Sequence, residues 1–102
     1  METRFFSRVK INHEIEALAQ DGFFIGILEN ISLGGLFIRT NKCINVGDQI
    51  EINIPLRSEF TMSNFAAKLI AIRSESEGVA FTFNDLDPKN FWTLQSFIKT
   101  VN

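Results

Sequence analysis

Apolar and polar residues alternate along much of this chain, which is the pattern of half-buried β-strands. The clearest example is Gln49–Ile54, where three isoleucines alternate with Gln, Glu and Asn. One face of this segment is therefore expected to meet a core and the other to meet water. Weaker versions of the pattern predict five further strands, at residues 14–17, 23–28, 36–39, 66–73 and 79–84.

Turn-forming residues separate the predicted strands. Asp21-Gly22 is a strong hairpin signal, with positive φ expected at both residues. Further turns are predicted where Gly, Asn, Asp and Ser gather, at residues 30–35, 46–48 and 75–78. Two segments lack a clear period, residues 2–13 and 56–64, and both are predicted as loops. Pro55 is expected to end the strand before the second loop.

A helix is predicted near the end of the chain. Asp87 and Pro88 suit the N-cap and the first helical position. The apolar residues that follow at helical spacing form a predicted stripe, namely Phe91, Leu94, Ile98 and Val101. This stripe should lie against the sheet or plug one end of a barrel.

Short strands followed by one helix favour a mainly β fold, a small six-stranded antiparallel β-barrel with a C-terminal α-helix. The length of 102 residues favours a single domain over 1–102. Side chains fill the interior of so small a barrel, so a ligand must bind on the outside. Residues 2–13 are the segment best placed to cover such a ligand.

Composition narrows the choice of function. The net charge of −2 and pI of about 5.3 argue against a partner that is a nucleic acid polymer. Positive charge nevertheless gathers at the start, where Arg4, Arg8 and Lys10 face only Glu2. A small dianion could be drawn there. The eleven phenylalanines, which have no polar group, are expected mostly in the core.

The chain lacks the residues that several classes of function require. Cys43 is the only cysteine, so an intrachain disulfide is impossible, which fits a reducing cytoplasm. His13 has no neighbour at metal-ligand spacing, and we expect neither a metal site nor a cofactor. No nucleophile–base pair is evident, so no enzyme is predicted. Apolar runs are too short to span a bilayer, so no membrane insertion is expected.

Two short motifs carry the most specific chemistry. Arg4 and Arg8, four residues apart, offer two planar forks that can bind phosphate or guanine. Asn30, Ser32 and Gly35 supply an amide, a hydroxyl and open backbone at a turn. Each motif alone is typical of solvated arginines or of an ordinary turn. In a barrel whose first two strands pair, however, the two motifs can converge on one site.

These motifs, RxxxR and (D/N)xSxxG, resemble the signature of the PilZ domain, a bacterial receptor for the second messenger cyclic di-GMP. The chain also resembles that family in Gly78-Val-Ala-Phe81 and in its terminal helix. The resemblance implies that Arg4 and Arg8 clamp guanine and phosphate groups of cyclic di-GMP. It implies that Asn30 and Ser32 hydrogen-bond a guanine or its phosphate surroundings, and that Gly35 permits close approach. It also implies that the loop around residues 2–10 becomes ordered on binding.

The resemblance therefore implies a nucleotide-binding receptor or adaptor in signal transduction, which acts on a downstream protein partner. Since three residues precede Arg4, we expect the output to pass to a separate protein. The alternative is a PilZ-like protein-interaction module, in motility or pilus assembly, that does not use its nucleotide site. A single-strand nucleic-acid binder that stacks bases on phenylalanines is a further hypothesis, and the acidic pI disfavours it.

Overall fold

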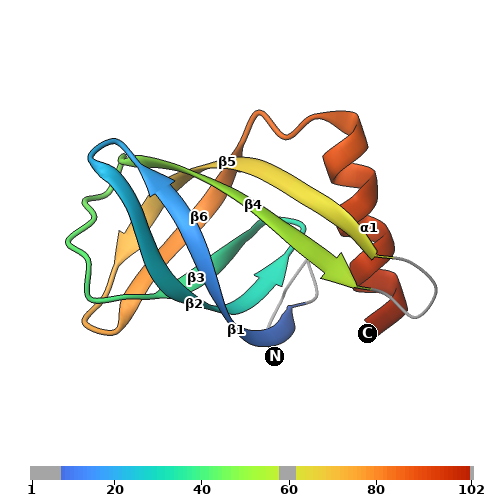
Figure 1. Ribbon diagram of the computed structural model, residues 1–102, viewed down its shortest axis with the longest axis horizontal. Coiled ribbons are helices and arrows are strands. Elements are labelled where there is room, and N and C mark those ends of the chain that lie inside the picture. Colours follow the sequence, from blue (N-terminus) through green and yellow to red (C-terminus); the bar gives the residue numbers. More distant parts are fainter. Residues whose placement is uncertain (1–7, 58–61, 102) are drawn as a thin grey trace, which may run out of the picture.

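Six β-strands and one α-helix form the protein in the computed structural model, which describes residues 8–57 and 62–101 (Figure 1). The strands close into an antiparallel barrel in the order β1-β2-β3-β6-β5-β4, and β4 pairs with β1. The bounds are β1 Val9–Ala19, β2 Gly22–Ser32, β3 Gly35–Arg39, β4 Gln49–Arg57, β5 Met62–Ser74, β6 Gly78–Asn84 and α1 Pro88–Val101. The predicted architecture is confirmed.

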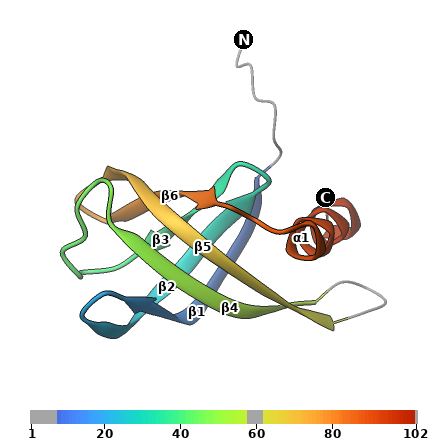
Figure 2. The ribbon, with the colours of Figure 1, turned by 90° about the horizontal axis from the view of Figure 1, so that it is seen from above.

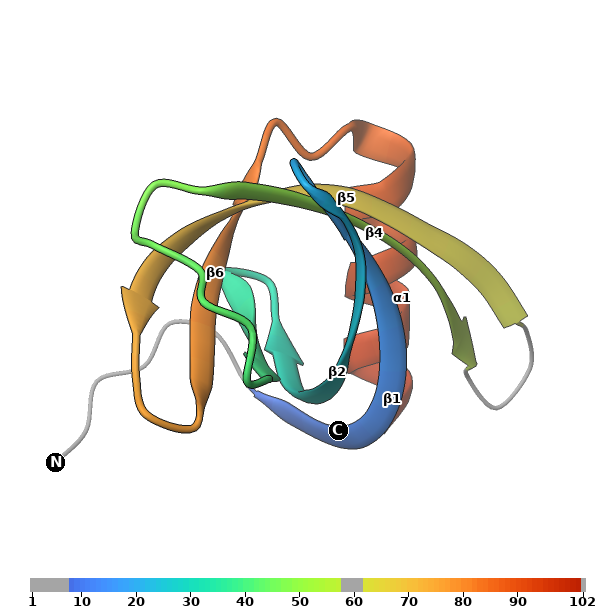
Figure 3. The ribbon, with the colours of Figure 1, turned by 60° about the vertical axis from the view of Figure 1, so that its left-hand side comes forward.

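The strands wrap around a common interior (Figure 3). Buried apolar side chains form one core cluster inside it. The alternation places four residues of β4 and four of β5 in this core, namely Ile50, Ile52, Ile54, Leu56, Phe65, Ala67, Leu69 and Ala71. Burying a large apolar side chain contributes about 1.5–3 kcal/mol. Phe65, Phe81 and Phe97 are buried, whereas Phe23 and Phe91 are exposed, so the rings are not all core residues. The filled interior leaves the outer surface for ligands.

Three β-bulges interrupt the ladders of the described strands. The register shifts between Lys10 and His13, between Leu28 and Asn30, and between Ala71 and Arg73. A bulge adds one residue to one strand and re-aims the side chains beside it. Those in β2 and β5 decide which side chains reach the outer surface where the strands approach the cleft described below.

The start of α1 is fixed by hydrogen bonds. The Asp87 carboxylate accepts the backbone N–H of Asn90 at 2.8 Å, as an N-cap does. This bond is the main reason that the pKa of Asp87 lies below its ordinary value. The Asn90 side-chain oxygen in turn accepts the backbone N–H of Ala66 at 2.8 Å, which ties the helix to β5.

The helix lies outside the barrel, beside β5 and β4 (Figure 2). Its buried face consists of Leu94, Phe97 and Ile98. The prediction for Phe91 was wrong, because that ring is 41% exposed, and Phe97 takes its place in the buried stripe. The side chain of Val101 lies outside the described residues.

Several strands are longer than the sequence predicts. β1 begins at Val9 and β5 at Met62, inside segments predicted as loops. β2 continues through Asn30 to Ser32, which were predicted as a turn, because these residues pair with β1 or β3. In each case, pairing with a neighbouring strand provides the hydrogen bonds that the local pattern did not indicate.

Pro55 does not end β4, since the strand continues to Arg57. Pro55 pairs with Asn64 of β5, whereas β1 meets β4 only at Glu51 and Ile52. One side of Pro55 therefore faces none of the described strands, and a residue without an N–H is tolerated at such an edge.

The first hairpin also differs from the expectation. Ala19 pairs with Gly22, so Gln20 and Asp21 form the centre of the turn. Only Gly22, at φ 125°, has a positive φ there.

Candidate ligand-binding cleft

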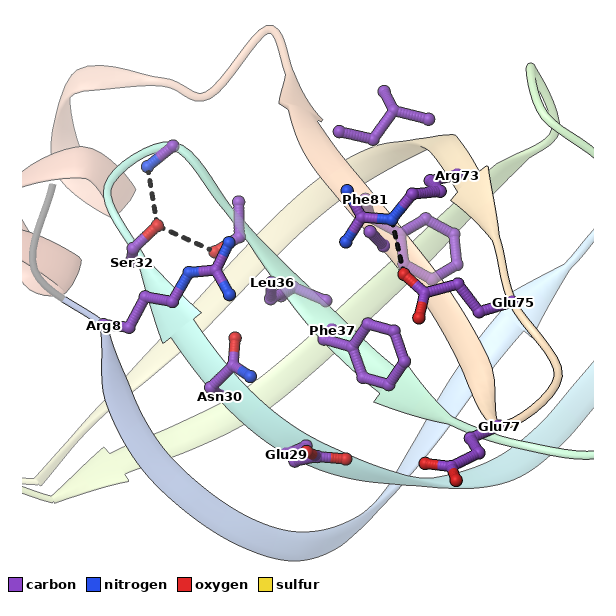
Figure 4. A pocket seen from close by; sticks show the side chains of 14 residues that line it. Arg8, Glu29, Asn30, Ser32, Leu36, Phe37, Arg73, Glu75, Glu77 and Phe81 are labelled. Atoms are coloured by element: carbon purple, nitrogen blue, oxygen red, sulfur yellow. Dashed lines mark hydrogen bonds and ion pairs between the residues drawn. The ribbon is translucent and has the colours of Figure 1, made fainter. Parts of the chain in front are cut away.

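A cleft of about 490 Å³ opens on the outer surface formed by β2, β3, β5 and β6 (Figure 4). This volume is in the range of small-molecule sites. Four predicted site residues line it, namely Arg8, Asn30, Ser32 and Gly35. Arg4 lies outside the described residues. The convergence predicted from strand pairing is thus present for the four residues that can be placed.

Hydrogen bonds hold the corner between β2 and β3. The buried Ser32 hydroxyl accepts the backbone N–H of Gly34 at 3.1 Å and donates to the carbonyl of Gly35 at 3.3 Å. Across the corner, the Thr82 hydroxyl donates to the carbonyl of Gly34 at 3.1 Å. These bonds fix the backbone beside the cleft, so a ligand meets a preorganised surface.

Gly35 is required by the closeness of β6. A Cβ atom built on Gly35 would overlap the carbonyl oxygen of Phe81 and would lie 3.2 Å from the Cα of Thr82. Both opposing groups belong to backbone, which cannot move aside as a side chain can. The third motif position therefore has a structural reason to be glycine in addition to any contact with a ligand.

Arg8 is placed by the pairing of β1 with β2. Val9 pairs with Ile31, so Arg8, one residue earlier, lies beside Ser32, one residue later. Its side chain is exposed, and Figure 4 shows the guanidinium between Ser32 and Asn30. A planar fork next to an amide and a hydroxyl can bind an anion or the acceptor edge of a purine.

The charges of the cleft were only partly foreseen. Besides Arg8, the lining includes Arg73 and three glutamates, Glu29, Glu75 and Glu77. Arg73 forms an ion pair with Glu75 through its Nε atom. Among the described lining residues, acids thus outnumber bases by one.

Sequence reasoning missed Arg73, although a signal was present. In β5 the buried positions alternate up to Ala71, and strict alternation would place Arg73 inside the barrel. A bulge at Ile72 turns the chain so that Arg73 is exposed at the cleft. Asn30 follows the same rule in β2, where the series Phe24, Gly26, Leu28 would place it inside without the bulge. A polar residue at an inward position of a strand can therefore indicate a bulge.

In the turn between β1 and β2, the Asp21 carboxylate accepts a hydrogen bond from Lys42 at 2.8 Å, and this bond is the first cause of the lowered pKa of Asp21. Within residues 8–57 and 62–101, no helix has the length and apolarity that crossing a bilayer would require. The same residues contain no cluster of three or more His, Cys, Asp or Glu side chains suited to a metal ion.

A comparison with protein families shows to which family the chain belongs. The family model described as the PilZ domain matches residues 2–100. The chain belongs to the PilZ family. No curated protein matches the sequence.

Solved structures that resemble this PilZ domain share its fold at low sequence identity. The Bacillus subtilis inhibitor of motility, MotI/DgrA, has a TM-score of 0.76 and 16% identity, covering 97% of this chain and 51% of that one. The chain thus spans about half the length of MotI. The PilZ domain of CeSA, from a cellulose-synthesizing bacterium, has a TM-score of 0.67 and 17% identity, covering 93% and 94%.

The PilZ domain of YcgR from Escherichia coli, solved with c-di-GMP, has a TM-score of 0.63 and 20% identity, and the match covers 98% of this chain and 92% of that one. At these identities the similarity establishes the barrel and its helix. Ligand contacts must be argued from the residues of this chain.

Proposed function

We propose that this PilZ domain, comprising residues 1–102, is a receptor for cyclic di-GMP. The observation that carries the proposal is that Arg8 lies in one cleft with Asn30, Ser32 and Gly35. A related structure, the YcgR domain, was solved with the same ligand. The function is binding and not catalysis, and the site uses neither a metal nor a further cofactor.

Each motif residue has a role that its chemistry supports. The Arg8 fork binds phosphate oxygens or the O6/N7 edge of guanine, and its bonds are charge-assisted. The Asn30 amide, next to it on the cleft wall, can donate to and accept from the ligand. Ser32 and Gly35 form the fixed corner on which the ligand rests.

Arg4 and the part of the segment around residues 2–10 that precedes Arg8 complete the site in this proposal. Arg8 directly precedes β1, so a ligand bound at Arg8 lies close to where the preceding segment enters the barrel. Arg4 then supplies a second fork, and the segment becomes ordered over the ligand. Such ordering creates a new surface for a downstream protein partner, which reads the ligand concentration. We propose that this takes place in the cytoplasm, in agreement with the single cysteine.

Isothermal titration calorimetry with cyclic di-GMP tests the proposal. We expect a Kd in the micromolar range or below, which corresponds to about −8 kcal/mol. Replacing Arg8 with Ala should weaken binding by about 1.5–3 kcal/mol, the value of a charge-assisted bond. Arg57→Ala is the control, because Arg57 is exposed at the end of β4 and does not line the cleft.

The acids of the cleft support a second candidate function. Glu29, Glu75 and Glu77 oppose a dianionic ligand. A PilZ domain that binds only a protein partner, with its nucleotide site unused, could carry this excess of acid. Absence of heat and of chemical-shift changes on addition of cyclic di-GMP to the wild type would favour this module over the receptor.

A further inference from the structure

Arg73 reaches the cleft from the side opposite Arg8. Arg8 lies directly before β1, next to β2, whereas Arg73 extends from the bulge of β5, beside β6 (Figure 4). The side chain of Arg73 is 58% exposed, so its guanidinium is accessible. The cleft thus presents planar forks of N–H donors at two separate places.

The partner of Arg73 is Glu75, which the turn between β5 and β6 supplies. The backbone N–H of Glu75 donates to the carbonyl of Gly78 at 2.8 Å, so the turn is held beside Arg73. The ion pair uses the Nε donor, one of five N–H donors of the guanidinium. Both side chains are about half exposed, at 58% and 44%, and ion pairs of this kind contribute little to stability.

We infer that Arg73 is a further ligand-binding residue of this cleft, and that Glu75 restrains it by neutralising its charge until a phosphate of the ligand takes the place of the carboxylate. The inference rests on the proposed function. Cyclic di-GMP carries two phosphates on opposite sides of its ring, so forks at two places in one cleft match its charges.

The balance of charge gives Glu75 its restraining role. Among the described lining residues, three glutamates stand against two arginines, so this part of the cleft offers a dianion no excess of positive charge. While Glu75 pairs with Arg73, its carboxylate occupies the Nε donor that a phosphate could otherwise use. When the phosphate replaces it, the guanidinium keeps a full set of charge-assisted bonds, and the freed carboxylate faces water.

Calorimetry with cyclic di-GMP on four proteins tests the inference: the wild type, Arg73→Ala, Glu75→Gln and the double variant. Arg73→Ala should raise the Kd about tenfold, through loss of a charge-assisted contact. Glu75→Gln should lower the Kd about threefold, the scale of an exposed ion pair. In the double variant the gain from Glu75→Gln should largely disappear, because Glu75 acts through Arg73.

Salt dependence separates this role from a merely structural one. Loss of Arg73 should flatten the dependence of log Kd on the logarithm of salt concentration, since one charge contact with the ligand is missing. The control Arg57→Ala should change neither the Kd nor this slope. Melting temperatures of all variants, measured without ligand, show whether the barrel is intact.

The outcomes are distinct. If the wild type binds cyclic di-GMP and Arg73→Ala binds equally well, the inference is wrong and the proposed function stands. If Glu75→Gln weakens binding, Glu75 orients Arg73 or contacts the ligand, and its restraining role is wrong. If the wild type shows no binding, the proposed function and this inference are both overturned.

Discussion

Gly35 and Phe81 lie so close together that a methyl group on Gly35 would overlap the carbonyl oxygen of Phe81. Gly35 is also the last residue of the motif that begins at Asn30. The same position therefore serves the packing of β3 on β6 and the shape of the ligand corner.

Gly35→Ala should consequently destabilise the fold by about 2 kcal/mol or more, as overpacking against backbone does. Gly47→Ala is the matched control. A Cβ on Gly47 meets nothing within 4 Å, so only the positive φ of 96° opposes it. We expect that control to cost about 1 kcal/mol. Urea denaturation of both variants measures the difference, and equal losses would contradict the predicted overlap.

Ser32→Ala should loosen the corner of the cleft without removing a charge. The hydroxyl bonds both Gly34 and Gly35, and the loss of such bonds costs about 1 kcal/mol in stability. Binding of cyclic di-GMP should weaken as well, because the corner is then less preorganised. The salt dependence of binding should stay that of the wild type, in contrast to Arg8→Ala. Calorimetry at two salt concentrations distinguishes the two variants.

Leu94→Ala tests the seat of the helix on the barrel. Leu94 is fully buried between α1 and the strands, and truncation of such a residue costs about 2–5 kcal/mol. Phe91→Ala should change stability by no more than about 0.5 kcal/mol, since that ring is exposed. Denaturant midpoints of the two variants report the contrast. A large loss of stability from Phe91→Ala would instead support the buried apolar stripe predicted from helical spacing.

Asp87 should make the free energy of unfolding depend on pH in the acidic range. Its pKa is lowered in the folded state, first by the backbone N–H of Asn90. The stabilisation is therefore present above the unfolded pKa of about 3.9 and is lost as the pH falls through the lower folded value. Asp87→Asn keeps an N-cap side chain but cannot titrate. Its melting temperature should fall less steeply below about pH 4 than that of the wild type.

The fold class could be predicted from the sequence because apolar and polar residues alternate in the strands whose inner face is buried. β4 shows this best, with four inward apolar residues in strict order. Strand ends were less accessible. Val9 and Met62 belong to strands because Ile31 and Arg57 of the neighbouring strands pair with them. The local pattern contains no trace of those partners.

Only one side of the candidate site could be predicted from the sequence. Arg8 directly precedes β1, and Asn30 and Ser32 lie in the adjacent β2, so their convergence follows from one hairpin. Arg73 and Glu77 come from the other end of the chain, and the closure of the barrel brings them to the cleft. The exposure of Arg73 also depends on a bulge at Ile72, which alternation alone does not place.

The barrel closes where β1 meets β4, and only Ala17 and Leu18 form that ladder, opposite Ile52 and Glu51. β2, β3, β6 and β5, which wall the cleft, are joined by longer ladders. The molecule is thus a cylinder with a short seam on the side away from the cleft. Amide hydrogens along that seam should exchange with solvent before those of the cleft wall. Transient opening of the seam would expose the edges of β1 and β4 to other chains.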